Sequence, residues 1–145
     1  GEGYCRNLNL PIPFPSGDDV FKLVIAFIDE ILEKYGPEFL IIQAGCDAYM
    51  GDPLVGLRLT DNSYHAFALM LSKFASRGIP IVVTGGGGYQ PEKVARLWAL
   101  MLACIAGRCI EELKPKDQET SSDYKLIKTM ESRIEYLKEK IISCL

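Results

Sequence analysis

The sequence predicts an α/β fold built around a parallel sheet, and three segments carry this prediction. Residues 39–44 and 81–84 are short apolar runs bounded by turn residues, which is typical of strands buried on both faces of a parallel sheet. Residues 61–76 lie between them and have apolar side chains at helical spacing. A strand, a helix and a second strand in this order favour a right-handed crossover that makes the two strands parallel.

The composition fits a globular domain and argues against two classes of partner. The chain has 145 residues, enough for one domain with a hydrophobic core. Its net charge is −3 and its basic residues are scattered, which argues against direct nucleic-acid binding. The longest apolar runs are too short to span a bilayer, so no membrane partner is expected.

The cysteine and histidine content bears on the cellular compartment and on metal binding. Five cysteines without a C-x-x-C pair favour a reducing compartment over a disulfide scaffold, and no charged-then-apolar leader segment begins the chain. The expected location is therefore the cytoplasm. A single histidine and the absence of paired cysteines argue against a structural zinc site.

The first part of the chain is expected to form a strand and then a helix. Residues 4–10 alternate between polar and apolar side chains, which favours a strand, and the prolines that follow end it. A helix over residues 18–35 has its apolar side chains at helical spacing. Ser16 or Asp18 is expected to cap it, and Gly36 to end it.

Two further helices are expected on either side of the second strand. Thr60 is a suitable N-cap for the helix over residues 61–76. The helix over residues 91–106 is apolar around most of its surface, which favours burial. Gly107 ends this helix.

The character of the sequence changes after Gly107, which predicts a division into residues 1–107 and residues 108–145. Residues 114–122 are polar and contain a proline, so a loop is expected. From about residue 123 to the end, apolar residues recur at three-four spacing. Two heptads are few for a coiled coil, so an amphipathic helix that docks back on the domain is favoured.

Polar side chains follow both predicted strands, at the end of the sheet where ligands of open α/β folds bind. Asp47 lies three residues beyond the first strand, and Tyr89 lies five residues beyond the second, after four consecutive glycines. A carboxylate can hold a metal, and a tyrosine hydroxyl can donate a hydrogen bond to a developing oxyanion. Together the two residues suggest metal-assisted attack on a carbonyl.

Simpler interpretations of the same residues remain open. An aspartate after a strand often forms a turn or caps a helix, and a tyrosine before a helix often packs against its neighbours. A glycine-rich turn between a strand and a helix often binds phosphate. The phosphate templates do not match, because Gln90 stands where a third glycine is needed and no Gly-Lys-Ser/Thr follows.

The motifs around these two residues resemble the zinc-dependent histone deacetylase family, in its deacetylase-like and acetoin-utilisation branch. They are Asn-Leu-Pro-Ile-Pro over 9–13, Gly-Cys-Asp-Ala-Tyr-Met-Gly-Asp-Pro-Leu over 45–54, Leu-Thr at 59–60, Gly-Gly-Gly-Gly-Tyr over 85–89 and Ala-Arg-Leu-Trp over 95–98. The motifs are specific when taken together in this order and at this spacing, and the match covers roughly residues 1–107. The resemblance implies a three-layer α/β/α fold with a parallel sheet, arginase/deacetylase-like, of which this chain is the C-terminal part.

The resemblance also implies roles for individual residues. Asp47 resembles a ligand of the catalytic zinc, and Tyr89 resembles the tyrosine that hydrogen-bonds the acyl carbonyl and its oxyanion. Leu54 resembles the apolar residue that lines the acyl-lysine channel, and Gly87 and Gly88 the backbone wall beside it. The implied reaction is hydrolysis of acetyl-lysine or a related acylated amine.

The chain departs from the family pattern in one large respect. The family's paired histidines and its Asp-x-His zinc ligands belong to the part that precedes this chain, and the histidine present, His65, lies inside a predicted helix where a surface or packing role is favoured. The remaining zinc ligands are therefore expected upstream, and the isolated chain is expected to bind zinc poorly and to be inactive. The alternatives are a non-catalytic deacetylase-like scaffold that binds a partner, and a nucleotide-binding domain that uses the glycines. The oligomeric state is left open.

Three residues inside the motifs receive structural interpretations. Cys46 is interpreted as a small packing residue. Arg96 is interpreted as an internally paired residue that braces the glycine loop. Asp52 is interpreted as a cap or bridge within its own loop.

Overall fold

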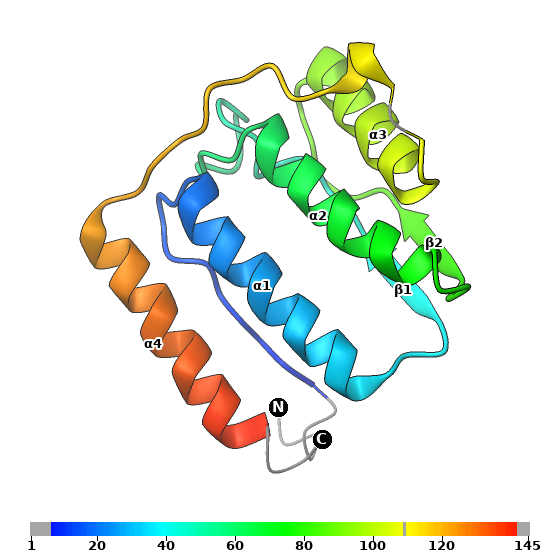
Figure 1. The fold of residues 1–145 in the computed structure, drawn as a ribbon. Helices are drawn as coiled ribbons and strands as arrows, with labels where there is room; N and C mark the ends of the chain where they lie inside the picture. Colours follow the sequence, from blue (N-terminus) through cyan, green and yellow to red (C-terminus); the bar gives the residue numbers. More distant parts are fainter. Residues whose placement is uncertain (1–6, 109, 142–145) are drawn as a thin grey trace.

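The computed structural model describes residues 7–108 and 110–141, which form helices packed on a small parallel sheet (Figure 1). The elements in chain order are α1 (Asp18–Tyr35), β1 (Leu40–Gln43), α2 (Asp61–Ala75), β2 (Ile81–Thr84), α3 (Pro91–Ile105), a short 3₁₀ helix η1 (Glu111–Leu113) and α4 (Tyr124–Ile141). None of the helices in these two ranges combines the length and apolar character needed to cross a membrane.

The sheet consists of β1 and β2, which run parallel with α2 as the crossover between them, as predicted. The register pairs Leu40 with Ile81 at one end and Gln43 with Thr84 at the other. The two strands therefore end side by side, and the loops that follow them start from the same edge of the sheet.

The hydrophobic core lies between one face of the sheet and the helices. Near the first half of the strands, Leu40 packs with Leu71 and Phe74 of α2. Near their carboxyl ends, Leu97 and Leu100 of α3 pack with partly buried strand residues. The core thus supports the ends of the strands from which the two candidate loops leave.

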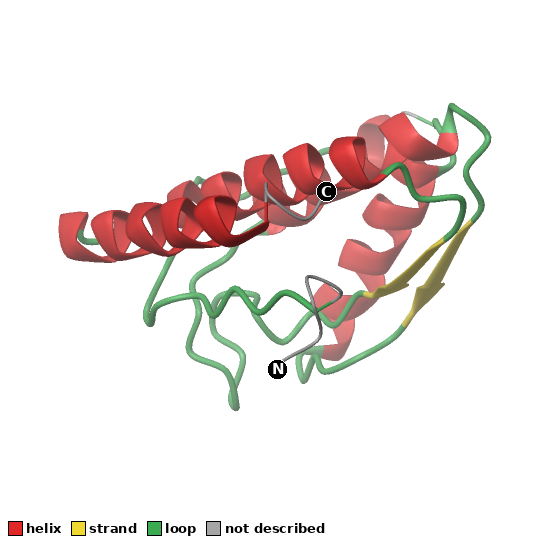
Figure 2. Cartoon of the chain, turned by 90° about the horizontal axis from the view of Figure 1, so that it is seen from below, coloured by secondary structure: helices red, strands yellow, loops and turns green. Residues whose placement is uncertain are grey.

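The opposite face of the sheet is exposed, so the prediction of strands buried on both faces is wrong for this chain. Ile41 is 71% exposed and Val82 is 46% exposed, although both are β-branched and apolar. The physical reason is the period of two along a strand, which points alternate side chains to opposite faces. The helices lie on only one side of the two strands (Figure 2).

Helix α3 is less enclosed than its apolar sequence predicted. Leu97, Leu100 and Met101 are buried, whereas the adjacent Leu102 is exposed. The reason is again one-sided packing, because α3 contacts the sheet, α2 and η1 through part of its circumference.

Helix α4 packs against α1, which confirms that the C-terminal amphipathic helix docks back on the domain. Met130 is fully buried in a cluster with Val20 and Val24, and Ile127 and Ile134 pack around it. Figure 1 shows the two helices side by side although they lie at opposite ends of the chain.

The remaining differences from the sequence predictions concern the ends of elements. Residues 7–10 form no strand, and residues 4–6 lie outside the described residues. The N-cap of α1 is Gly17, without a side-chain cap; Ser16 donates to the Pro13 carbonyl instead. Thr60 caps α2 as predicted and accepts from the Asn62 backbone N–H. The η1 turn was not predicted.

Asp18 does not cap α1 because its carboxylate joins three separate parts of the fold. It accepts hydrogen bonds from the Thr60 backbone N–H and hydroxyl, both at 2.9 Å. It also accepts from the Ser63 hydroxyl at 2.5 Å and from the Thr120 backbone N–H at 2.8 Å. The start of α1, the start of α2 and the segment before α4 therefore meet at one buried carboxylate.

Candidate functional site

The candidate site is formed by two loops that leave the carboxyl ends of β1 and β2 and stay in contact. Backbone hydrogen bonds join them, from the Ala44 N–H to the Thr84 carbonyl at 2.9 Å and from the Cys46 N–H to the Gly87 carbonyl at 2.6 Å. The loops thus extend the pairing of the strands by several residues. As a result, Asp47 and Tyr89 are carried by neighbouring segments, as the sequence predicted.

The glycines allow the two loops to approach closely. A Cβ added at Gly87 would lie 2.6 Å from Cγ of Asp47, and closer still to its Oδ2. Gly88 has a φ of +141°, which side chains rarely adopt, and a Cβ there would lie 2.8 Å from Cγ2 of Val94. These positions require glycine because the neighbouring loop and α3 occupy the space of a side chain.

Asp47 presents a half-buried carboxylate against the Gly87 backbone. Within residues 7–108 and 110–141, no N–H or hydroxyl group donates a hydrogen bond to this carboxylate, unlike the carboxylates of Asp18 and Asp52. Its oxygens are therefore free to bind another group, such as a metal ion.

Asp52 connects the two loops, in addition to the bridge within its own loop that the sequence predicted. Its Oδ1 accepts from the backbone N–H groups of Leu54 at 2.9 Å and Val55 at 3.1 Å, which confirms the predicted bridge within its own loop. Its Oδ2 accepts from the backbone N–H of Tyr89 at 2.9 Å. One carboxylate therefore sets the position of Tyr89 relative to the loop that carries Asp47.

The charge on Asp52 is favoured by these hydrogen bonds. Burial opposes ionisation, but the bonds donated by the backbone N–H groups outweigh it and hold the pKa of Asp52 below its usual value. The side chain is thus a fixed anion that accepts from both loops at neutral pH.

Tyr89 and Leu54 lie at the surface beside this junction. Tyr89 is 53% exposed and Leu54 is 69% exposed. In the part of the chain that the structure describes, the Tyr89 hydroxyl has no hydrogen-bond partner. Exposed apolar and phenolic side chains, on loops that also carry the Asp47 carboxylate, are suited to binding a further group.

Two other residues of the motifs have structural roles. Burial raises the pKa of the Cys46 thiol to about 11, and the charge of Asp47 adds to this effect, so the thiol stays protonated in the core as a packing residue. Arg96 is paired internally, but with the segment after α3 and not with the glycine loop. It donates to the carbonyls of Glu112 at 2.8 Å and Lys114 at 2.6 Å.

His65 is not part of the site. It is half-buried on α2 and lines a separate cavity of about 440 Å³ with residues of α3 and the following segment. Within the two described ranges, no group of three His, Cys, Asp or Glu side chains is placed to hold a metal ion. A single carboxylate such as that of Asp47 can fill only one position of a zinc site, and a catalytic zinc needs three protein ligands.

Loss of the Asp52 carboxylate is expected to loosen Tyr89 specifically. In Asp52→Ala, amide hydrogen exchange at Tyr89 should accelerate by roughly tenfold or more, because its N–H loses a charge-assisted acceptor. Glu92→Ala is the matched control, since Glu92 is exposed near Tyr89 and makes no hydrogen bond among the described residues. Equal exchange at Tyr89 in both variants and wild type would show that Asp52 does not hold this residue.

Comparison with known proteins places this chain in one family. A family model described as the histone deacetylase domain matches residues 1–105. Histone deacetylase 7 of Arabidopsis thaliana is 33% identical over 132 residues, which is 87% of this chain and 32% of that protein. Histone deacetylase clr6 of Schizosaccharomyces pombe is 32% identical over 135 residues, with the same two coverages. The chain spans about a third of the length of these relatives.

Solved structures share the fold at lower sequence identity. The HD domain of HDA15 aligns with a TM-score of 0.72 at 22% identity and covers 94% of this chain and 36% of that chain. The histone deacetylase Clr3 aligns with a TM-score of 0.78 at 19% identity and covers 100% of this chain and 23% of that chain. The fold is thus the predicted arginase/deacetylase-like α/β type, present in part. The chain belongs to the histone deacetylase family, whose domain model matches residues 1–105.

Proposed function

We propose that this chain is the C-terminal part of a zinc-dependent deacetylase that hydrolyses acetyl-lysine or a related acylated amine. The observation that carries the proposal is the contact between the Asp47 and Tyr89 loops at the carboxyl ends of neighbouring parallel strands. Metal-assisted hydrolysis of an amide can use a carboxylate as a metal ligand and a phenol as a hydrogen-bond donor. The loops at the carboxyl ends of these two strands carry one of each.

Each residue has a proposed task in this reaction. Asp47 would provide one oxygen ligand to zinc, and the remaining ligands and the general base would come from residues outside this chain. When bound, zinc would polarise the acyl carbonyl and activate a water molecule. Tyr89 would donate a hydrogen bond from its hydroxyl group to the oxygen on which negative charge develops. Asp52 would hold the Tyr89 backbone in place for that donation.

The acyl chain would pass along the exposed surface next to these groups. Leu54 would provide an apolar wall, and the side-chain-free backbone of Gly87 and Gly88 would form the opposite wall. A channel bounded by apolar groups suits the methylene chain of an acylated lysine or a similar amine.

The proposal is tested by two substitutions in the complete deacetylase domain that contains this chain. Tyr89→Phe is expected to lower kcat by about 10²–10³-fold, because one hydrogen bond to the oxyanion is lost. Asp47→Ala is expected to abolish stoichiometric zinc binding, measured by metal analysis after dialysis, because a direct ligand is lost. Tyr35→Phe, at an exposed tyrosine of α1, is the matched control. Wild-type turnover in both site variants would rule out the assignment.

A non-catalytic, deacetylase-like scaffold is the second candidate. It is favoured by the absence, within residues 7–108 and 110–141, of a group of three metal-binding side chains. Sequencing the coding region upstream separates the two candidates. An open frame that encodes a His-His pair and an Asp-x-His motif supports the enzyme, and a zinc titration of the isolated chain is then expected to show only weak binding.

A further inference from the structure

The segment after α3 is fastened to the two helices that flank the candidate site. The carboxylate of Asp61, at the start of α2, accepts from the backbone N–H groups of Lys116 at 2.8 Å and Asp117 at 3.2 Å. It also forms an ion pair with Arg96 of α3 at 3.7 Å. Arg96 in turn donates to two carbonyls of this segment. Side chains of both α2 and α3 therefore hold the segment in place.

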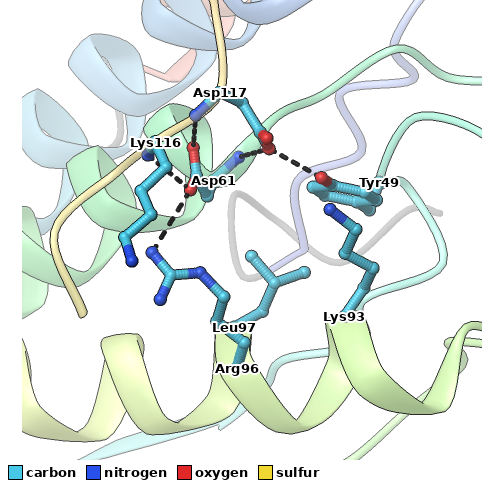
Figure 3. Close-up of a pocket in the computed structure, with 7 residues that line it drawn as sticks. All are labelled: Tyr49, Asp61, Lys93, Arg96, Leu97, Lys116 and Asp117. Carbon is cyan, nitrogen blue, oxygen red and sulfur yellow. Dashed lines mark hydrogen bonds and ion pairs between the residues drawn. The ribbon is translucent and has the colours of Figure 1, made fainter. Parts of the chain in front are cut away.

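From this anchored position, Asp117 reaches the loop that carries Asp47. Its Oδ2 accepts from the Tyr49 hydroxyl at 2.6 Å and more weakly from the Asp61 N–H at 3.4 Å. Figure 3 shows the Asp117 carboxylate facing the Tyr49 hydroxyl, with Lys93 of α3 beside the tyrosine ring. The Lys93 Nζ lies 5.3 Å from the ring centroid, within cation–π range.

Tyr49 lies at the centre of the turn that holds both site carboxylates. Its N–H donates to the Cys46 carbonyl, and its own carbonyl accepts from the Asp52 N–H, both at 3.1 Å. The side chain is 6% exposed and packs against the Tyr64 ring with centroids 6.5 Å apart. Fixing this ring therefore fixes the backbone between Asp47 and Asp52.

The hydrogen bond between Tyr49 and Asp117 is of the stronger kind. The Tyr49 hydroxyl donates to a carboxylate oxygen at 2.6 Å, so the bond is charge-assisted. Such a bond is about twice as strong as one between neutral groups.

We infer that Asp117 is a positioning residue of the candidate site, which holds the turn over residues 46–52 through the Tyr49 hydroxyl. Its use in catalysis rests on the function proposed above, but its effect on the turn does not. Through Asp117, Asp61 and Arg96, the segment after α3 connects the turn that carries Asp47 to α2 and α3.

The test compares amide hydrogen exchange at Tyr49, Met50 and Asp52, whose N–H groups are all hydrogen-bonded within or next to the turn. Exchange at these amides is expected to accelerate roughly tenfold in Tyr49→Phe and in Asp117→Ala, with α1 and α4 unchanged. Asp117→Asn retains one acceptor oxygen and should change exchange less. The double variant should add little to either single one, because both remove the same bond.

Glu119→Ala is the matched control, since Glu119 lies on the same segment but pairs with Lys22 at the surface. Zinc affinity of the complete domain is then expected to fall several-fold in Asp117→Ala and to be unchanged in the control. Unchanged exchange at the three amides in both Tyr49→Phe and Asp117→Ala would overturn the inference, as would an equal acceleration throughout the chain. Accelerated exchange in a complete domain that binds no zinc would retain the positioning role and reject the proposed function.

Discussion

Gly87→Ala is expected to remove most zinc binding and turnover from the complete deacetylase domain. A Cβ at this position would lie 2.6 Å from Cγ of Asp47, far inside a normal contact. The Gly87 carbonyl is held by the Cys46 N–H at 2.6 Å, so the two loops cannot separate without loss of that bond. The Asp47 carboxylate must therefore move. A displacement of about 1 Å at a catalytic group can lower the rate by about 10²-fold.

Gly85→Ala is the matched control for this experiment. It lies in the same run of glycines, but a Cβ there would meet only Cζ2 of Trp98, at 3.8 Å, which is an ordinary contact. Metal analysis and kcat are measured for both variants, with circular dichroism to confirm that each is folded. If a folded Gly87→Ala variant retained wild-type zinc content and turnover, Asp47 would not be the ligand that the proposed function requires.

Asp18→Asn is expected to destabilise the fold by about 2–4 kcal/mol at neutral pH, the range for a broken buried hydrogen-bond network. The Asp18 side chain is fully buried and accepts from Thr60, Ser63 and Thr120. An asparagine has only one acceptor oxygen, and its NH₂ group would face donors. The loss is measured by chemical denaturation, with Glu38→Gln as a control at an exposed carboxylate without hydrogen bonds among the described residues.

The pH dependence of this loss distinguishes a charged network from simple packing. Burial would raise the pKa of Asp18, but the hydrogen bonds that it accepts outweigh this effect and lower the pKa below the usual 3.8. A lowered pKa in the folded state stabilises the fold above about pH 4, and this contribution is lost as the pH falls through the folded pKa. The difference between wild type and Asp18→Asn should therefore shrink below about pH 4. A difference that stayed constant down to pH 2 would contradict this account.

Much of the secondary structure could be predicted because its signals are local. The apolar run over residues 81–84 and the cap at Thr60 mark their elements through neighbours in sequence, and the structure agrees with both. The positions of Asp47 and Tyr89 after their strands follow from the same local information, once the strands are parallel. The relation between the two loops then follows from the rule that parallel strands end at the same edge.

The partners of the carboxylates could not be predicted in this way. From its neighbours in sequence, Asp18 is predicted to cap a helix and Asp52 to form a turn. An aspartate at either position has nearby backbone N–H groups from which it can accept hydrogen bonds. The folded chain instead brings Thr120 to Asp18 and the Tyr89 N–H to Asp52, across 102 and 37 residues. The bond between Tyr49 and Asp117 spans 68 residues. The spacing of these residues along the sequence does not indicate that they lie close together in the folded chain.

The sequence by itself therefore determined the order of α1 to α4 and of the two strands, the parallel sheet and the residues that follow its strands. These depend on periodicity, caps and turns, which act over a few residues. Only the tertiary structure decided that one face of the sheet is exposed and that Asp52 joins the two loops of the site. It also decided that the segment after α3 reaches the turn beside Asp47. These features depend on which surfaces meet when the helices pack, and that is set by the geometry of the whole chain.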